Sequence, residues 1–177
     1  MAEKIYTLKE NGELGGLVDR QEVHAKGILH AGVQCWLMNE NDQVLLQRRA
    51  ATKDKSAGKW DVSFGGHCTE SHLHQDILLA NLIKEGKEEI GFTIEPEKVI
   101  KLGEVRYTSQ KGMNREILSV YLIMVDALQG FSFEDGEVTE VKWIDVKTLR
   151  DCIIRDKENY ANRLGAVSLL EIYLNHR

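Results

Sequence analysis

Short hydrophobic runs, several with a polar residue at every second position, recur along the chain and are typical of β-strands. Residues 116–125 are apolar almost throughout, as expected for a strand at the centre of a sheet. Turns rich in Asn, Gly and acidic residues separate several of these runs. The pattern predicts strands over residues 4–8, 13–18, 29–38, 43–47, 60–64, 99–108, 116–125 and 140–146.

Helical segments are marked by their ends and by a wider apolar spacing. Asp19 followed by Glu22 fits a helix N-terminal capping box, and Gly27 can end the short helix that follows. Further helices are predicted from a start between Ser71 and Asp76 to Gly91, over 147–155 and over 157–175. Strands and helices mix without a regular βαβ repeat. The order favours an α/β sandwich built on mixed β-sheets over a Rossmann-type fold.

The composition excludes several classes of partner. A net charge of −5 lacks the basic excess that binds a nucleic acid polymer. Cys35, Cys68 and Cys152 are scattered and odd in number, which indicates reduced thiols and a cytoplasmic location. The N-terminus lacks an apolar signal core, and no apolar run approaches the roughly 20 residues that span a membrane. We therefore expect no membrane partner.

The helix over residues 76–91 has two distinct faces. Glu85, Glu88 and Glu89 lie at positions i, i+3 and i+4, so three carboxylates share one face and repel one another. A divalent cation would remove that penalty, and clustered carboxylate oxygens suit Mg²⁺ or Mn²⁺. A glycine inside a helix is unfavourable, so Gly86 indicates close packing on a sheet. The apolar face comprises Leu79, Leu82, Ile83, Gly86 and Ile90.

This helix and the glycine turn before it resemble a known motif. The stretch from Gly65 to Phe92 resembles the Nudix box, whose second half here reads Lys84-Glu85-Gly86-Lys87-Glu88-Glu89-Ile90-Gly91-Phe92. Segments 43–49, 58–61 and 137–143 also resemble that family. The resemblance implies a Nudix-type α/β/α sandwich with mixed β-sheets. We expect a single domain over 1–177, with an N-terminal hairpin and short helix (1–27), a core (28–150) and a C-terminal helix (151–177).

The box departs from the family pattern in three places. Lys84 stands where Arg is usual, which keeps the charge but loses the planar fork. Gly86 replaces a larger apolar residue, and the spacer before Lys84 is about four residues longer, roughly one helical turn. Two alignments follow. Asp76 replaces the first glutamate of the box, or Glu70-Ser71 is the equivalent pair and residues 72–75 add a helical turn. The second is favoured because Ser71 can cap the longer helix.

The resemblance implies a hydrolase that cleaves a phosphoanhydride bond in a nucleoside diphosphate linked to another group, or in a related diphosphate. Glu85, Glu88 and Glu89 would bind Mg²⁺ or Mn²⁺. Lys84, Glu85 and Glu88 would be catalytic, with Lys84 orienting the carboxylates. Gly66 and His67 would contact the substrate phosphates. The general base stays open among Glu85, Glu116, Glu137 and Glu140.

Three histidines support a second interpretation. The positions of His24, His30 and His67, with Glu116, are similar to the metal site of type I isopentenyl-diphosphate isomerases, although Asn114 fills the place of a second acid. The isomerases carry their catalytic cysteine two residues before the turn histidine, where this chain has Gly65. The hydrolase is therefore favoured. The alternatives are an isomerase-like enzyme and a non-catalytic module that senses a nucleotide.

The expected partner is a small-molecule diphosphate, and a homodimer through the end segments is plausible from the sequence. Loops 50–59 and 108–115 are candidate rims of the pocket. Basic residues in or near these loops could offset the negative net charge beside an anionic ligand. They are Lys53, Lys55, Lys59, Arg106, Lys111 and Arg115.

Overall fold

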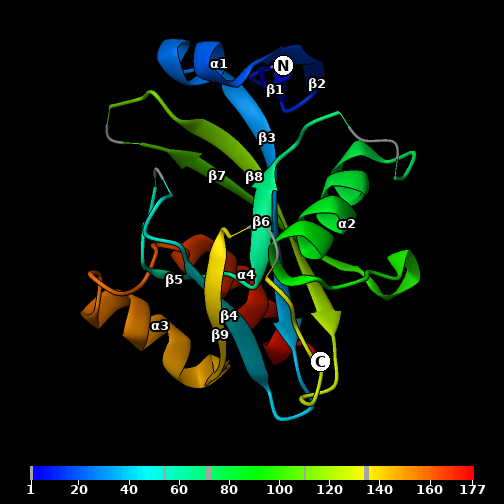
Figure 1. Cartoon of the computed structure of the whole chain (residues 1–177), viewed down its shortest axis with the longest axis vertical. Coiled ribbons are helices and arrows are strands. Elements are labelled where there is room, and N and C mark those ends of the chain that lie inside the picture. The colour runs from blue at the N-terminus through cyan, green and yellow to red at the C-terminus, as the bar shows by residue number, and fades with distance from the viewer. Residues whose placement is uncertain (1, 54, 71–72, 110, 134–135) are drawn as a thin grey trace.

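The computed structural model describes residues 2–53, 55–70, 73–109, 111–133 and 136–177. Nine strands form one sheet in this part of the chain, with α1, β1 and β2 at one end of the long axis (Figure 1). The strands are β1 Lys4–Leu8, β2 Leu14–Asp19, β3 Leu29–Met38, β4 Gln43–Arg49, β5 Trp60–Asp61, β6 Phe64–His67, β7 Ile100–Thr108, β8 Arg115–Met124 and β9 Val138–Asp145. The helices are α1 Arg20–Lys26, α2 Ile77–Ile90, the 3-10 turn η1 Pro96–Lys98, α3 Val146–Arg155 and α4 Leu164–Asn175.

Strand β3 organises the mixed sheet. One of its edges pairs in parallel with β8 over its whole length, from Leu29 opposite Arg115 to Met38 opposite Met124. It also pairs antiparallel with β1, β6 and β4. Strand β4 continues the sheet to β5 and β9, and β8 continues it to β7. The starts of β3 and β8 therefore lie side by side, next to the end of β6.

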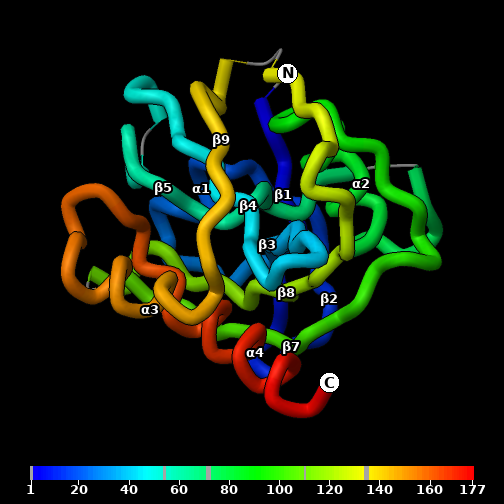
Figure 2. Tube along the Cα trace, turned by 90° about the horizontal axis from the view of Figure 1, so that it is seen from below, coloured from blue at the N-terminus to red at the C-terminus, as the bar shows by residue number. Residues whose placement is uncertain are grey.

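The sheet separates two hydrophobic cores. Successive side chains of a strand point to opposite faces. Val33 and Cys35 of β3 accordingly join Leu82 of α2 in one core, while Trp36 of β3 joins Leu170 of α4 in the other. Figure 2 shows β3 and β8 between α2 and α4. The predicted α/β/α sandwich on a mixed sheet is confirmed.

Helix α2 begins later than the favoured alignment requires. Asp76 is its N-cap, and its Oδ1 accepts from Leu78 N at 2.8 Å and Leu79 N at 3.2 Å. Residues 73–75 are not helical, so the predicted extra turn is wrong. The reason is that Asp76 already satisfies the first free amides of the helix. Ser71, the predicted cap, lies outside the described residues.

The prediction of one helix over residues 157–175 is also wrong, because α4 begins only at Leu164. The backbone before it is bound to β5. Trp60 N donates to Asn159 O, and Ala161 N donates to Trp60 O, both at 2.8 Å. These strand-like hydrogen bonds cannot form from a helical backbone. The connection between α3 and α4 is therefore extended at this point and fixed beside β5.

The single strand predicted over residues 60–64 is two strands. β5 pairs with β4, whereas β6 pairs with β3. At the break, the Ser63 hydroxyl donates to Leu45 O at 2.7 Å and accepts from Leu37 N at 2.8 Å.

Across the described residues, no helix combines the length and the apolar character needed to cross a membrane.

Candidate active site

A cavity of about 730 Å³ opens beside the carboxylate face of α2. Its wall is built by β3, β4, β6 and β8, by the loop after β4, and by the connection before α4. Lys84, Glu85, Glu88 and Glu89 all line it, together with Gly66 and His67 of β6. The structure thus brings most of the predicted site residues to one space.

Glu89 lies at the buried base of the carboxylate face. Only 3% of the residue is exposed, and its Oε2 accepts from Gln47 Nε2 at 2.8 Å and Gly65 N at 3.1 Å. Burial and the neighbouring Glu85 raise the pKa of Glu89 to about 8, although these hydrogen bonds and Arg49 oppose the shift. The pKa of Glu85 is raised as well, so the charged forms of these neighbouring carboxyls are disfavoured. A divalent ion would favour the charged form of both.

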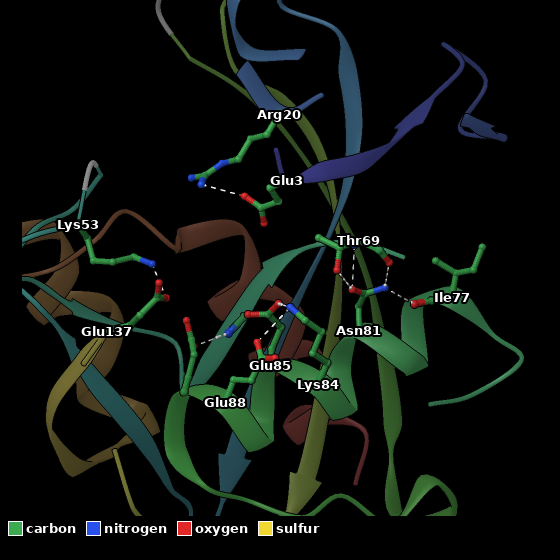
Figure 3. A network of polar contacts seen from close by, with 12 residues as sticks. Glu3, Arg20, Lys53, Thr69, Ile77, Asn81, Lys84, Glu85, Glu88 and Glu137 are labelled. Carbon is green, nitrogen blue, oxygen red and sulfur yellow. Dashed lines mark hydrogen bonds and ion pairs between the residues drawn. The ribbon is translucent and has the colours of Figure 1, made fainter. Parts of the chain in front are cut away.

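Lys84 lies between the other two carboxylates of the helix (Figure 3). Its Nζ is 3.3 Å from Glu85 Oε1 and 3.1 Å from Glu88 Oε2. Burial raises the pKa of Glu85, with repulsion from Glu88 and Glu137 adding to the shift and Lys84 opposing it. Lys84 is thus placed to orient both carboxylates, while Glu88 remains about half exposed to the cavity.

The glycine turn leaves room for Glu85. A Cβ atom on Gly66 would lie 2.4 Å from Glu85 Oε2, which is closer than real side chains approach. A Cβ on Gly65 would lie 2.4 Å from Val33 O and 3.1 Å from Gln34 Cα, both in the backbone of β3. Gly66 therefore makes space for the Glu85 carboxylate. Gly65 cannot be replaced by a larger residue without movement of the strand.

Asn81 fixes α2 to the chain that follows β6. Its Oδ1 accepts from Thr69 N at 2.9 Å, and its Nδ2 donates to Thr69 O at 2.9 Å and Ile77 O at 2.8 Å (Figure 3). The side chain is fully buried, so these bonds satisfy it in a region of low dielectric. The clamp sets the position of the carboxylate face relative to the glycine turn.

A second group of potential ligands lies where the starts of β3 and β8 meet the end of β6. One ligand atom from each of His24, His30, His67 and Glu116 lies within 4.8 Å of the others. The three rings form a triangle with centroids 5.1–5.2 Å apart. Glu116 Oε1 lies 3.5 Å from His30 Nε2 and 3.4 Å from His67 Nε2.

The donors of this group suit a metal ion. His30 Nδ1 lies 2.9 Å from Ile28 O, a contact that holds the ring with Nε2 directed toward Glu116. Nε2 of His24 and of His30 is buried without a hydrogen-bond partner among the described residues. Burial, with nearby positive charges, lowers the pKa of His24 to about 4, so its ring is neutral at pH 7. Neutral imidazoles with unused nitrogens are the form that metals bind.

Asn114 adds an oxygen to the same group. Its Nδ2 donates to Glu116 Oε1 at 2.8 Å, and its Oδ1 is buried with no hydrogen-bond partner in the described part of the chain. Burial alone would raise the pKa of Glu116, but contacts with His30, His67 and Asn114 hold it well below its usual range. Glu116 is thus charged and faces the cavity.

Three of the predicted site residues lie elsewhere. Asp76 caps α2, and Glu70 is exposed to solvent. Glu140 Oε1 accepts from Arg48 Nη1 at 2.8 Å on the surface of β9. None of them is among the described residues that line the cavity, whereas Glu137 is. Of the six basic residues predicted for the rim, Lys53 and Lys55 line the cavity, and Lys59, Arg106, Lys111 and Arg115 do not.

Several residues that shape the site were not predicted from the sequence. Gln47, in the cavity wall, and Asn81, behind it, act through hydrogen bonds between distant segments, and a single Gln or Asn gives no pattern of its own. Arg20, Arg49 and Arg163 line the same wall although they are far apart in the chain. The run Gln47-Arg48-Arg49 at the end of a strand was the only local signal among them.

Comparison with known proteins identifies the fold family. The family model for the NUDIX domain matches residues 28–164. Nudix hydrolase 3 of Arabidopsis thaliana is 31% identical over 170 residues, which cover 90% of this chain but only 22% of that longer protein. An isopentenyl-diphosphate Delta-isomerase of Aliivibrio fischeri is 28% identical over 149 residues, covering 81% of this chain and 80% of the isomerase.

A solved structure shows the same architecture over the whole chain. DR0079 from Deinococcus radiodurans superposes with a TM-score of 0.73, covering 97% of this chain and 99% of that one. At 19% identity, this likeness concerns the fold. The mixed-sheet sandwich with a carboxylate-bearing helix over its cavity is thus a Nudix fold. The chain belongs to the NUDIX family, as the box predicted.

Proposed function

We propose that this chain is a metal-dependent hydrolase that cleaves a phosphoanhydride bond in a nucleoside diphosphate linked to another group, or in a related diphosphate. The observation that carries the proposal is the common cavity of Glu85, Glu88 and Glu89, two of which have raised pKa values. Such a cluster is unfavourable alone and favourable around a cation.

The residues of α2 would hold Mg²⁺ or Mn²⁺. A bound ion would neutralise the diphosphate and lower the pKa of an attacking water. Lys84 keeps Glu85 and Glu88 in place by ion pairs, and the glycine turn lets the Glu85 carboxylate reach the cavity. The residues that act on the substrate are therefore aligned before it binds, which lowers the cost of ordering them.

The general base is proposed from the carboxylates that reach the cavity. Glu85, Glu116 and Glu137 do so, whereas Glu140 is paired with Arg48 outside it. Glu85 and Glu116 are each proposed as ligands of a cation, so neither is left to accept a proton from the attacking water. Glu137 forms an ion pair with Lys53 of the loop after β4 (Figure 3). Its charge also contributes to the raised pKa of Glu85. We assign the base role to Glu137.

The group of His24, His30, His67 and Glu116 is proposed as a second cation site. Imidazole nitrogens with one carboxylate suit a transition metal better than Mg²⁺. The ion would be held beside the glycine turn, since His67 directly follows Gly66. Its positive charge would add to the attraction for phosphate oxygens in the cavity.

An isomerase-like activity is the second candidate, because isopentenyl-diphosphate Delta-isomerases are among the relatives and the histidine group is present. Gly65 argues against it. A cysteine there would place Cβ 2.4 Å from Val33 O. Cys68 is fully buried, and burial raises the pKa of its thiol to about 12, so it cannot serve in place of the missing cysteine. A non-catalytic nucleotide sensor is the third candidate.

The test is incubation of the purified chain with Mg²⁺ and a panel of nucleoside diphosphate-linked compounds and isoprenoid diphosphates. We expect metal-dependent hydrolysis of at least one compound. A Glu95→Gln/Glu97→Gln variant changes two exposed glutamates outside the cavity and is the matched control for Glu88→Gln/Glu89→Gln. Hydrolysis that is equal in both variants would refute the proposal, and tight binding without turnover would favour the sensor.

A cytoplasmic location and a homodimer remain predictions of the sequence. The small-molecule partner is proposed to be a diphosphate, for which the basic residues Lys53 and Lys55 line the cavity.

A further inference from the structure

Asp61 is a buried carboxylate on the cavity wall that the proposed metal sites do not use. Its side chain is 1% exposed. Arg163 Nε donates to Oδ1 at 2.6 Å, and Arg163 Nη2 donates to Oδ2 at 2.8 Å. Val62 N also donates to Oδ1 at 2.8 Å. This two-bond pairing fixes both the place and the plane of the guanidinium.

The backbone also keeps Arg163 at this position. The segment before it is hydrogen-bonded to Trp60 on both sides of Tyr160, and Asp61 pairs with Gln47 of β4. Arg163 is the N-cap residue of α4, which packs on the sheet. The Arg163 guanidinium is fixed by Asp61, and its backbone is fixed beside β5. The side chain therefore loses little conformational freedom when it binds a ligand.

Two guanidiniums share the one carboxylate. Arg49 Nη1 lies 3.7 Å from Asp61 Oδ2, and all three residues line the cavity. The trio therefore carries a net positive charge. Arg163 Nη1 makes no hydrogen bond within the described part of the chain, and 27% of the side chain is exposed. Its N–H groups are available to a ligand in the cavity.

The trio lines the same cavity as residues of the two proposed metal sites. Arg49 is close enough to Glu89 to lower its pKa. Burial alone would lower the pKa of Arg163, but Asp61 raises it, and Glu116 and Tyr107 add to that shift. The positive group thus shares one cavity with the carboxylate helix and with Glu116 of the histidine group, where the diphosphate is proposed to bind.

Planar guanidiniums with free N–H groups match phosphate oxygens. An apolar chain at this wall would remove charged groups from water without replacing their hydrogen bonds. We propose that Arg49 and Arg163, held by Asp61, form a subsite for an additional phosphate group, so that preferred substrates carry a phosphate beyond the scissile diphosphate. The inference rests on the proposed function and specifies its substrate class.

The additional phosphate could follow the diphosphate in line or be attached to the rest of the substrate. Two pairs of uncleavable probes, titrated calorimetrically with Mg²⁺, separate these sources. The first pair is imidodiphosphate and its three-phosphate homologue. The second is methylene-bridged ADP and its 3′-phosphorylated derivative. Within each pair the probes differ by one phosphate, and the ratio of their Kd values is the measurement.

We expect a gain of about tenfold or more from the extra phosphate in one of the two pairs, which corresponds to charge-assisted hydrogen bonds at one subsite. The Asp61→Asn/Arg163→Gln variant replaces the ion pair by two amides and should bring that ratio close to one. Arg163→Lys keeps the charge but loses the planar guanidinium, so the extra phosphate should improve its Kd less than that of the wild type. This variant provides a second test if the double variant folds poorly.

The control variant is Arg150→Gln/Glu171→Gln, which removes a similar two-bond pair between α3 and α4 outside the cavity. It should leave the ratio unchanged. Equal Kd values within both pairs in the wild type, or a gain that survives in both Arg163 variants, would overturn the subsite alone. Failure of the wild type to bind any probe, together with no hydrolysis in the panel, would overturn the subsite and the proposed function together.

Discussion

Glu85 and Glu89 show how single side chains are prepared for a cation. Both are largely buried, and burial raises their pKa values. Repulsion from Glu88 and Glu137 adds to the shift of Glu85, and repulsion from Glu85 adds to the shift of Glu89. Lys84, Gln47 and the Gly65 amide compensate only part of that cost. The protein thus keeps two carboxyls where neither ionises easily alone, an arrangement typical of functional sites.

Gly66→Ala should lower hydrolysis with little loss of stability. The new Cβ would meet the end of the Glu85 side chain, which can turn away, so folding is hardly affected. Displacement of a catalytic group by about 1 Å can cost roughly 100-fold in rate. Steady-state kinetics and thermal unfolding would measure both effects. Gly130→Ala is the control, since a Cβ there meets nothing within 4 Å, and equal rates for the two variants would contradict this role of Gly66.

The Asp61–Arg163 ion pair should make the free energy of unfolding depend on pH in the acidic range. Burial alone would raise the pKa of Asp61, but Arg163 and Arg49 hold it below its usual value. Its contribution is therefore complete above the unfolded pKa of about 4 and is lost as pH falls through the lower folded pKa. In urea unfolding, wild type should exceed Asp61→Asn/Arg163→Gln in free energy at pH 7, and the gap should shrink below about pH 4. A gap that stays constant down to pH 3 would refute this account.

Individual site residues differ in how far the sequence could predict them. Glu85, Glu88 and Glu89 share a helical spacing, so their common face was predictable from the helical period. Arg163 and Asp61 are 102 positions apart and belong to no periodic pattern. Their contact depends on the extended connection beside β5. The sequence analysis had predicted that this connection was part of a helix over residues 157–175.

At the scale of elements, α2 carries the site and its ends fix its register. Asp76 caps its first turn, and Gly91 ends it in the left-handed region with φ 64°. Strand bounds were predicted within a few residues because alternation of hydrophobic and polar side chains is a local signal. The N-cap of α2, Asp76, lies within the predicted interval, but the extra turn of the favoured alignment does not form. The sequence alone could not choose between Ser71 and Asp76, because both residue types are good caps.

Asp76→Ala should lower the free energy of unfolding by about 1 kcal/mol, the usual effect of losing an N-cap. Hydrolysis per folded molecule should not change, because Asp76 is outside the cavity. Asp76→Asn keeps a capping side chain and should retain the stability. Chemical denaturation and kinetics of the three proteins would measure this. A large loss of activity in both variants at normal stability would instead support the alignment in which Asp76 replaces the first glutamate of the box.

At the scale of the whole molecule, the histidine group joins separate parts of the fold. His24 comes from α1, His30 from β3, His67 from β6 and Glu116 from β8. An ion bound by all four would tie the N-terminal segment to the sheet. Ligand binding to the native state stabilises it by about 2.7 kcal/mol at a concentration 100 times the Kd.

We therefore expect Mn²⁺ to raise the Tm by about 5 °C or more over that of the EDTA-treated protein, given roughly 2–4 °C per kcal/mol at this chain length. His24→Gln should reduce that shift, and the part that remains would come from Mn²⁺ bound at α2. The control is His176→Gln, at the end of α4 and outside the group. Equal shifts in the two variants would exclude the histidine group as the ion's site.

The central claim is that water, activated at the carboxylate face of α2, cleaves a phosphoanhydride bond. The most direct measurement is the reaction in ¹⁸O-water with Mg²⁺ and a substrate selected from the panel, followed by mass spectrometry of the products. We expect one solvent oxygen in one of the two phosphate-containing products, and a rate at least about 100-fold lower in Glu88→Gln/Glu89→Gln. Products without solvent oxygen, or an equal rate in that variant, would contradict it.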